Sequence, residues 1–251
     1  MKNTALALLG LLLLTACEKP ERVIPSHVAT NPVPRDEKWM TRHNTFNEIS
    51  KKGEATLVFL GDSITQGWEK NGKAAWEKFY GSRKAANFGI GGDRTEHVLW
   101  RLDNGNFDGL KPKLIVLMIG TNNTGHAGRP MKELNDANYE CSADQTFDGV
   151  ELILRRLKTK APQAKVLVLG IFPRGENNED AMRKQNQETN AKIATLADGK
   201  RIHYLDISQT FLQPDGTLTR EVMPDLLHLS ENGYGMWAEA IEPKIKELLG
   251  E

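Results

Sequence analysis

The sequence predicts an α/β protein, a flavodoxin-like three-layer α/β/α sandwich built on a five-stranded parallel sheet. Short apolar or β-branched segments alternate along the chain with amphipathic ones, and such alternation gives a parallel sheet with helices on both faces. The strand segments are apolar at nearly every position, as in residues 113–119. This pattern is expected where helices bury a strand on both sides.

Five strands are expected, at residues 56–60, 84–88, 113–119, 165–171 and 201–206. Helical periodicity predicts helices near 36–50, 95–102, 147–157 and 179–197. A last helix should begin near Ser230, whose hydroxyl can cap it. Because crossover connections are right-handed, few topologies remain, and we expect the strand order 2-1-3-4-5. In such sheets ligands bind beyond the carboxyl ends of the strands.

The N-terminal residues 1–16 are expected to lie outside the fold. Lys2 precedes an apolar stretch over residues 5–14, which is too short to span a bilayer and is typical of an export signal. Residues 14–17, Leu-Thr-Ala-Cys, resemble the lipobox of bacterial lipoproteins. In that family the chain is cut before the cysteine, which then carries the lipid. Cys17 would therefore anchor an exported protein to the bacterial cell envelope, on its periplasmic or surface side. An ordinary cleaved signal or a buried apolar helix is the alternative.

The proline-rich residues 17–35 are expected to form a tether, and residues 36–251 a single domain. The 251 residues, 39% of them hydrophobic, suffice for one large core.

The formal net charge is zero, which argues against nucleic acid as the main partner. No histidine pair has zinc-ligand spacing, so we expect no metal. No other cofactor is expected, because Arg94 replaces the third glycine of a dinucleotide-binding loop.

The parts of an acyl-transfer hydrolase occur at four places in the chain. Ser63 follows the first strand, Gly92 follows the second and Asn122 follows the third, so all three should meet at one edge of the sheet. Asp225 and His228 follow far downstream, three residues apart. A serine hydroxyl needs a base to become nucleophilic, and histidine titrates in the right range. Backbone and side-chain amides can stabilise an oxyanion.

In order, Gly61-Asp62-Ser63, Gly91-Gly92-Asp93, Gly120-Thr121-Asn122 and Asp225-x-x-His228 resemble the four sequence blocks of the SGNH (GDSL) hydrolases. Longer flanking matches over about residues 52–249 are similar to the catalytic subunits of platelet-activating-factor acetylhydrolases. The resemblance implies Ser63 as nucleophile, His228 as general base and Asp225 as its orienting acid. It also implies an oxyanion hole formed by the N–H groups of Ser63 and Gly92 and the amide of Asn122.

The resemblance further implies a serine esterase that removes a short acyl group, most simply acetyl, from a small-molecule or glycan ester. The expected location at the cell envelope suggests an acetylated glycan as the natural substrate, with a phospholipid-type acetyl ester as alternative. Close relatives form dimers, so a homodimer is a further expectation.

Each residue also has an ordinary structural interpretation: Ser63 and His228, for example, could simply cap helices. A non-catalytic glycan-binding lipoprotein or a flavin-binding carrier on the same scaffold are the rival hypotheses. The polar segment 124–145 could be a lid or a solvated insertion.

Overall fold

The computed structural model describes residues 21–251, so the expected signal segment and Cys17 lie outside the described residues. Five strands form one sheet with parallel pairing throughout: β1 (Leu57–Gly61), β2 (Ala85–Gly89), β3 (Leu114–Met118), β4 (Lys165–Leu169) and β5 (Ile202–Leu205). Their order is β2-β1-β3-β4-β5. This confirms the predicted order and the flavodoxin-like three-layer class.

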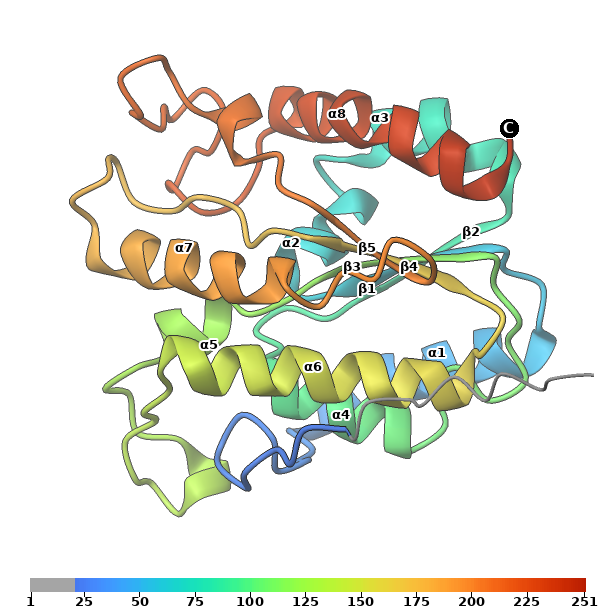
Figure 1. Cartoon of the computed structure of the whole chain (residues 1–251), viewed down its shortest axis with the longest axis horizontal. Helices are drawn as coiled ribbons and strands as arrows, with labels where there is room; N and C mark the ends of the chain where they lie inside the picture. The colour runs from blue at the N-terminus through green and yellow to red at the C-terminus, as the bar shows by residue number, and fades with distance from the viewer. Residues whose placement is uncertain (1–20) are drawn as a thin grey trace, which may run out of the picture.

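Helices cover both faces of the sheet (Figure 1). One face packs against α1 (Glu37–Lys52), α4 (Thr95–Asp103), α6 (Ala143–Lys160) and α7 (Ala181–Ala194), and the other against α3 (Lys73–Tyr80) and α8 (Glu231–Leu249). The short helices α2 (Ser63–Gln66) and α5 (Thr121–Gly125) follow β1 and β3. Single turns of 3-10 helix are η1 (Gly67–Glu69), η2 (Gly81–Arg83), η3 (Lys132–Leu134) and η4 (Ser208–Phe211).

The inner strand β1 is buried on both faces. Val58 and Leu60 join the core under α1, α4 and α6, whereas Leu57 and Phe59 join the core under α3 and α8, because side chains alternate along a strand. Phe59 packs its ring against four aromatic side chains, those of Trp68, Trp76, Tyr80 and Trp237. Full burial of such a side chain contributes about 1.5–3 kcal/mol. The end of β1, which leads into Ser63, is therefore firmly held.

Side-chain caps decide where the longer helices begin. Asp36 accepts the Trp39 N–H at 2.9 Å at the start of α1, and Ser230 accepts the Gly233 N–H at 3.1 Å at the start of α8, as predicted for the last helix. Helix α6 begins at Ala143 rather than at the predicted residue 147. Ser142 and Gln145 form a capping box there, which extends the helix towards its N-terminus.

Residues 21–35, which the sequence assigns to a tether, lie against the domain. Ala29 is fully buried, and its carbonyl accepts a hydrogen bond from Thr95 Oγ1 at 2.8 Å. The guanidinium of Arg22 pairs with Asp148 and Glu151 of α6. These contacts are polar and long-range, so a segment with little apolar periodicity gives no sequence signal of them. The part of the expected tether from residue 21 onward therefore packs on α4 and α6.

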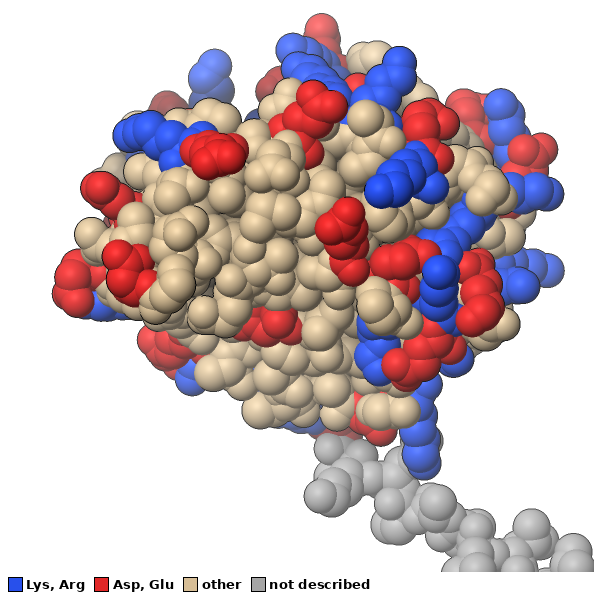
Figure 2. All heavy atoms as spheres, turned by 90° about the horizontal axis from the view of Figure 1, so that it is seen from above, with Lys and Arg blue, Asp and Glu red and all other residues tan. Residues whose placement is uncertain are grey.

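None of the helices within residues 21–251 is both long and apolar enough to cross a bilayer. On the face that carries α3 and α8, basic and acidic side chains are interspersed (Figure 2). No continuous field of one sign covers that face, so it offers no strong electrostatic attraction for a highly charged polymer.

Candidate active site

The carboxyl edge of the sheet gathers the residues that follow β1, β2 and β3. Asp62 and Ser63 open α2 directly after β1, Gly91 lies in the loop after β2, and Asn122 lies in α5 after β3. Helix α2 approaches β2 closely: a Cβ atom on Gly89 would lie 2.2 Å from the Gln66 nitrogen, so only glycine fits there. This close contact brings the loop after β2 beside Ser63.

The hydroxyl of Ser63 lies against the ring of His228. Ser63 Oγ is 2.9 Å from His228 Nε2, and His228 Nδ1 is 2.6 Å from Asp225 Oδ2. With the ring proton on Nδ1, the imidazole donates to the carboxylate and accepts from the hydroxyl. An imidazole held in this way can take the hydroxyl proton and return it later.

The turn that carries Asp225 and His228 is held by the Asp225 carboxylate itself. Asp225 Oδ1 accepts the backbone N–H groups of Leu227 at 3.1 Å and His228 at 2.7 Å, while Leu226 adopts a left-handed φ of 60°. Partial burial opposes ionisation of Asp225, but the hydrogen bonds from the His228 ring and backbone outweigh it and lower the pKa of the carboxyl. Both side chains remain open to solvent, at 57% for Asp225 and 42% for His228.

The amide groups expected to form the oxyanion hole belong to Ser63, Gly92 and Asn122. Gly92 has a φ of 79°, which glycine adopts without strain. Asn122 is nearly buried, and its Nδ2 donates one proton to the Asp93 carbonyl at 3.0 Å, which leaves the second amide proton available. In the hydrogen bonding of residues 21–251, the backbone N–H groups of Ser63 and Gly92 have no acceptor. These groups can bind a negatively charged oxygen.

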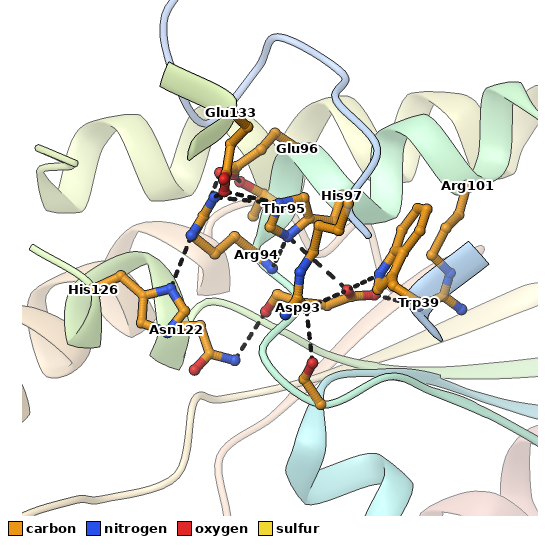
Figure 3. A network of polar contacts seen from close by, with 12 residues as sticks. Trp39, Asp93, Arg94, Thr95, Glu96, His97, Arg101, Asn122, His126 and Glu133 are labelled. Carbon is orange, nitrogen blue, oxygen red and sulfur yellow. Dashed lines mark hydrogen bonds and ion pairs between the residues drawn. The ribbon is translucent and has the colours of Figure 1, made fainter. Parts of the chain in front are cut away.

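The loop that holds Gly92 is fixed through Asp93, which is fully buried (Figure 3). Its carboxylate accepts hydrogen bonds from Trp39 Nε1 and from Arg101 Nη1, both at 2.6 Å. Arg101 is itself fully buried and also donates to the Phe88 carbonyl at 2.6 Å. A buried ion pair with these extra hydrogen bonds allows little freedom of position. Asp93 thereby ties the loop to α1, α4 and β2.

Asp62 is a second buried carboxyl, directly before Ser63. Its Oδ1 accepts the Ile64 N–H at 2.9 Å and caps α2, whereas its Oδ2 has no partner among the described residues. Burial, reinforced by the negative charge of Asp93, raises the pKa of Asp62 to about 7. This carboxyl therefore changes its charge near neutral pH beside the serine.

The segment 124–145, for which the sequence leaves two interpretations, is anchored beside Asn122 by Arg94. The Arg94 guanidinium donates to His126 Nδ1 at 2.9 Å and pairs with Glu133, and it lies 4.3 Å from the centre of the buried Tyr139 ring (Figure 3). Burial, together with the positive charge of Arg94, lowers the pKa of His126 to about 4. Arg94 thus holds part of the segment against the domain, and the choice between a lid and a solvated insertion stays a prediction.

Two arginines of the site have no counterpart among the residues expected from the sequence. Arg35 lies at the end of the expected tether. In the sequence, Arg94 stands out only because it occupies the position of the third glycine of a dinucleotide-binding loop. Arg35 contacts Gly91 across 56 residues, and Arg94 contacts His126 and Glu133 across 32 and 39 residues, in addition to a local pair with Glu96. At the start of α4, the Arg94 backbone N–H donates to His97 Nδ1 at 3.0 Å, whereas the guanidinium, which has no acceptor, cannot cap the helix. Within residues 21–251, no group of three or more His, Cys, Asp or Glu side chains is arranged to hold a metal ion.

A serine, a histidine and a carboxylate within hydrogen-bond reach, with amide donors at the carboxyl edge of a five-stranded parallel sheet, define a hydrolase of the SGNH type. The model of the GDSL-like Lipase/Acylhydrolase family matches residues 59–236, and the chain belongs to this family. It is 37% identical over 217 residues to platelet-activating factor acetylhydrolase IB subunit alpha1 of Homo sapiens, with 86% of each chain covered. It is 36% identical over 224 residues to subunit alpha2 of Gallus gallus, covering 89% of this chain and 90% of that one.

Solved structures agree on the fold. A GDSL-like lipase from Bacteroides thetaiotaomicron superposes with a TM-score of 0.64 at 22% identity, covering 82% of this chain and 97% of that one. An acetyl xylan esterase superposes with a TM-score of 0.57 at 21% identity, covering 75% and 98%. Family and relatives together establish that the chain is a carboxylic ester hydrolase.

Proposed function

We propose that the chain hydrolyses short-chain acyl esters, most simply acetyl esters, through an acyl-enzyme intermediate on Ser63. One observation carries the proposal: Ser63 Oγ lies 2.9 Å from His228 Nε2, and the opposite ring nitrogen lies 2.6 Å from Asp225. A protein that only binds a ligand has no need for this alignment. The arrangement is that of an activated nucleophile with an oriented base.

In the proposed first half-reaction, Ser63 Oγ attacks the ester carbonyl carbon while His228 Nε2 takes the hydroxyl proton. The carbonyl π electrons move to the oxygen, which receives hydrogen bonds from the N–H groups of Ser63 and Gly92 and from Asn122 Nδ2. Collapse of this intermediate breaks the bond to the alcohol, which leaves with the proton from His228. Asp225 holds the ring and stabilises its positive charge.

In the second half-reaction, water takes the place of the alcohol. His228 removes one proton from the water as its oxygen attacks the acyl-enzyme carbonyl, and the same amide groups stabilise the second oxyanion. Ser63 then leaves and recovers its proton from His228. The products are the free acid and the unchanged enzyme.

The acetyl group is favoured by the names of the relatives. Two comparisons point to proteins named for acetyl esters, a platelet-activating factor acetylhydrolase subunit and an acetyl xylan esterase. Together with the expected export signal, this supports an acetylated carbohydrate as the substrate, with a phospholipid-type acetyl ester as the second candidate. Acetate release from acetylated xylooligosaccharides and from an acetylated phospholipid analogue, each with wild type and Ser63→Ala, tests the proposal. Full acetate release by Ser63→Ala would overturn it.

We also propose that the mature protein is exported and held at the cell envelope by lipid on Cys17. The lipobox-like residues 14–17 and the apolar stretch before them support this. Stable anchoring requires more than one acyl chain, as a lipidated cysteine provides. Incorporation of a tagged palmitate into wild type but not into Cys17→Ala is the expected result. Equal labelling of both proteins would remove the anchor from the account.

A further inference from the structure

We propose that Arg35 is a positioning residue for the oxyanion hole, acting through the peptide group that joins Gly91 to Gly92. This inference rests on the proposed function, in which the Gly92 N–H binds the developing negative charge. Arg35 Nη1 donates to the Gly91 carbonyl at 2.8 Å. That carbonyl and the Gly92 N–H belong to one planar amide. Arg35 therefore holds one end of the peptide group whose other end would serve catalysis.

The contact has two physical consequences for the Gly92 N–H. Because the amide is rigid, fixing its carbonyl also fixes the direction of its N–H. A cationic donor on the carbonyl oxygen also draws electrons from the nitrogen, which makes the N–H a stronger donor, since hydrogen bonds in a chain polarise one another. The hydrogen bond from this oriented and polarised N–H strengthens as negative charge forms on the substrate oxygen, so it favours the transition state over the bound ester.

The charges around the loop add to this effect. Asp93 is the buried carboxylate of the loop, and it contacts Arg101 at 2.6 Å and Arg35 at 3.6 Å. One carboxylate thus faces two guanidinium groups. Arg101, fully buried with Asp93, is its closer partner, whereas the Arg35 side chain is 27% exposed and lies between Asp93 and the Gly91 carbonyl.

Arg35 also covers Gly92 sterically. A Cβ atom on Gly92 would lie 3.0 Å from Arg35 Nη1 and 3.1 Å from Nη2. The backbone around Arg35 is tied down on both sides: Val33 N–H donates to the Glu96 carbonyl at 3.5 Å, and Asp36 caps α1. The guanidinium thus reaches the loop from a fixed point on the chain.

Arg42 provides a matched control. It lines the same cavity of about 420 Å³ as Arg35, together with Trp39, Gln66 and Gly91. It also donates to a loop carbonyl, that of Gly89, at 2.8 Å. The N–H of that peptide, on Ile90, donates to the Gly61 carbonyl at 3.2 Å and is unavailable to a substrate. The two arginines therefore line one cavity and each donates to a main-chain carbonyl, but they hold different peptides. Arg42 also pairs with Glu69 at 2.6 Å, a contact that Arg35 lacks.

The test compares Arg35→Ala, Arg35→Lys and Arg42→Ala in the full chain, with 4-nitrophenyl acetate as substrate and rates expressed per site titrated by a fluorophosphonate. We expect Arg35→Ala to lower the rate of Ser63 acetylation about 10- to 100-fold, the range for loss of a charge-assisted hydrogen bond, with KM little changed. Arg35→Lys should recover part of the rate. Millimolar methylguanidinium, entering the emptied cavity, should rescue Arg35→Ala but not Arg42→Ala.

Equal losses in Arg35→Ala and Arg42→Ala, or a loss in Arg35→Ala that methylguanidinium does not reverse, would overturn the inference. A general structural role would lower the melting temperature and the titrated fraction without a selective effect on acetylation. Failure of the proposed function would give a different result from failure of this inference, because Ser63→Ala would then keep the wild-type rate. An inactive Ser63→Ala beside a fully active Arg35→Ala rejects the role of Arg35 alone.

Discussion

The loop that carries Gly92 and the turn that carries His228 both border Ser63, but the fold holds them very differently. Asp93, at the end of the loop, is fully buried and bonded to Trp39 and Arg101. The Asp225 and His228 side chains are about half exposed, and the turn is held mainly by hydrogen bonds to the Asp225 carboxylate. Oxyanion donors act by being fixed before the reaction, whereas a base must move protons and meet water. We therefore expect substitutions in the exposed turn to lower activity without loss of stability, and substitutions in the buried loop to lower the free energy of unfolding.

The largest effect on activity is expected on the exposed side, without loss of stability. His228→Ala removes the base, and the turnover of 4-nitrophenyl acetate should fall by about 10⁴- to 10⁶-fold, as when a member of a catalytic triad is removed. Because the side chain is half exposed, the free energy of unfolding should change by less than about 0.5 kcal/mol. Steady-state kinetics and urea unfolding measure both quantities. A strongly destabilised His228→Ala would contradict the comparison.

The largest effect on stability is expected on the buried side. Arg101→Met leaves the Asp93 carboxylate with one of its two closest donors removed, and breaking a buried pair costs about 3–5 kcal/mol of unfolding free energy. Arg156→Met is the matched control, because its pair with Asp103 is partly exposed and such pairs contribute about 0–1 kcal/mol. Urea unfolding measures the free energy of unfolding of both variants. Similar losses of this free energy in the two would show that burial is not the cause.

Removal of one oxyanion donor should give an intermediate effect on activity. Asn122→Ala removes no group that transfers a proton. The turnover should nevertheless fall by about 100- to 1000-fold, which corresponds to an increase of about 3–4 kcal/mol in activation free energy. Asn122 also donates to the Asp93 carbonyl, so a stability loss of about 1 kcal/mol should accompany it. A change in KM alone, with normal turnover, would assign Asn122 to substrate binding instead.

The smallest effect concerns Asp62 and depends on pH. Its pKa is raised to about 7 in the folded chain, against about 3.9 for a free side chain. The folded state therefore binds the proton more tightly, and the free energy of unfolding falls as pH rises from about 4 to about 7. Asp62→Asn keeps a capping oxygen without this penalty, so it should gain about 1–3 kcal/mol over wild type at pH 8 and almost nothing at pH 4. A difference independent of pH would contradict the buried, ionising carboxyl.

The parts of the molecule that the sequence predicts are those with local patterns. Mainly apolar strand segments predict the sheet, right-handed crossovers limit its order, and Ser230 marks the start of α8. The start of α6 was also within reach, because Ser142 and Gln145 have capping-box spacing. The short α3 (Lys73–Tyr80) is not predicted, because its 8 residues are too few to show a long apolar period.

The residues that hold the catalytic groups in place could not be predicted in the same way. Ser63, Gly92, Asn122 and His228 stand in recognisable blocks, but the groups that fix them do not. Arg35 contacts Gly91 across 56 residues, and Arg94 contacts Glu133 across 39. Such contacts depend on the folded packing of segments and leave no periodicity in the sequence. The same holds for residues 21–35, whose hydrogen bonds to α4 and α6 exist only once those helices are in place.

The most direct test of the account is the site and speed of reaction with a fluorophosphonate. The folded wild-type chain should take up one probe per molecule, on the peptide that contains Ser63. Ser63→Ala should take up none, and His228→Ala should react far more slowly. Labelling of another residue at the wild-type rate, or equal labelling of wild type and His228→Ala, would contradict the claim that the 2.9 Å contact between Ser63 and His228 makes this serine the nucleophile.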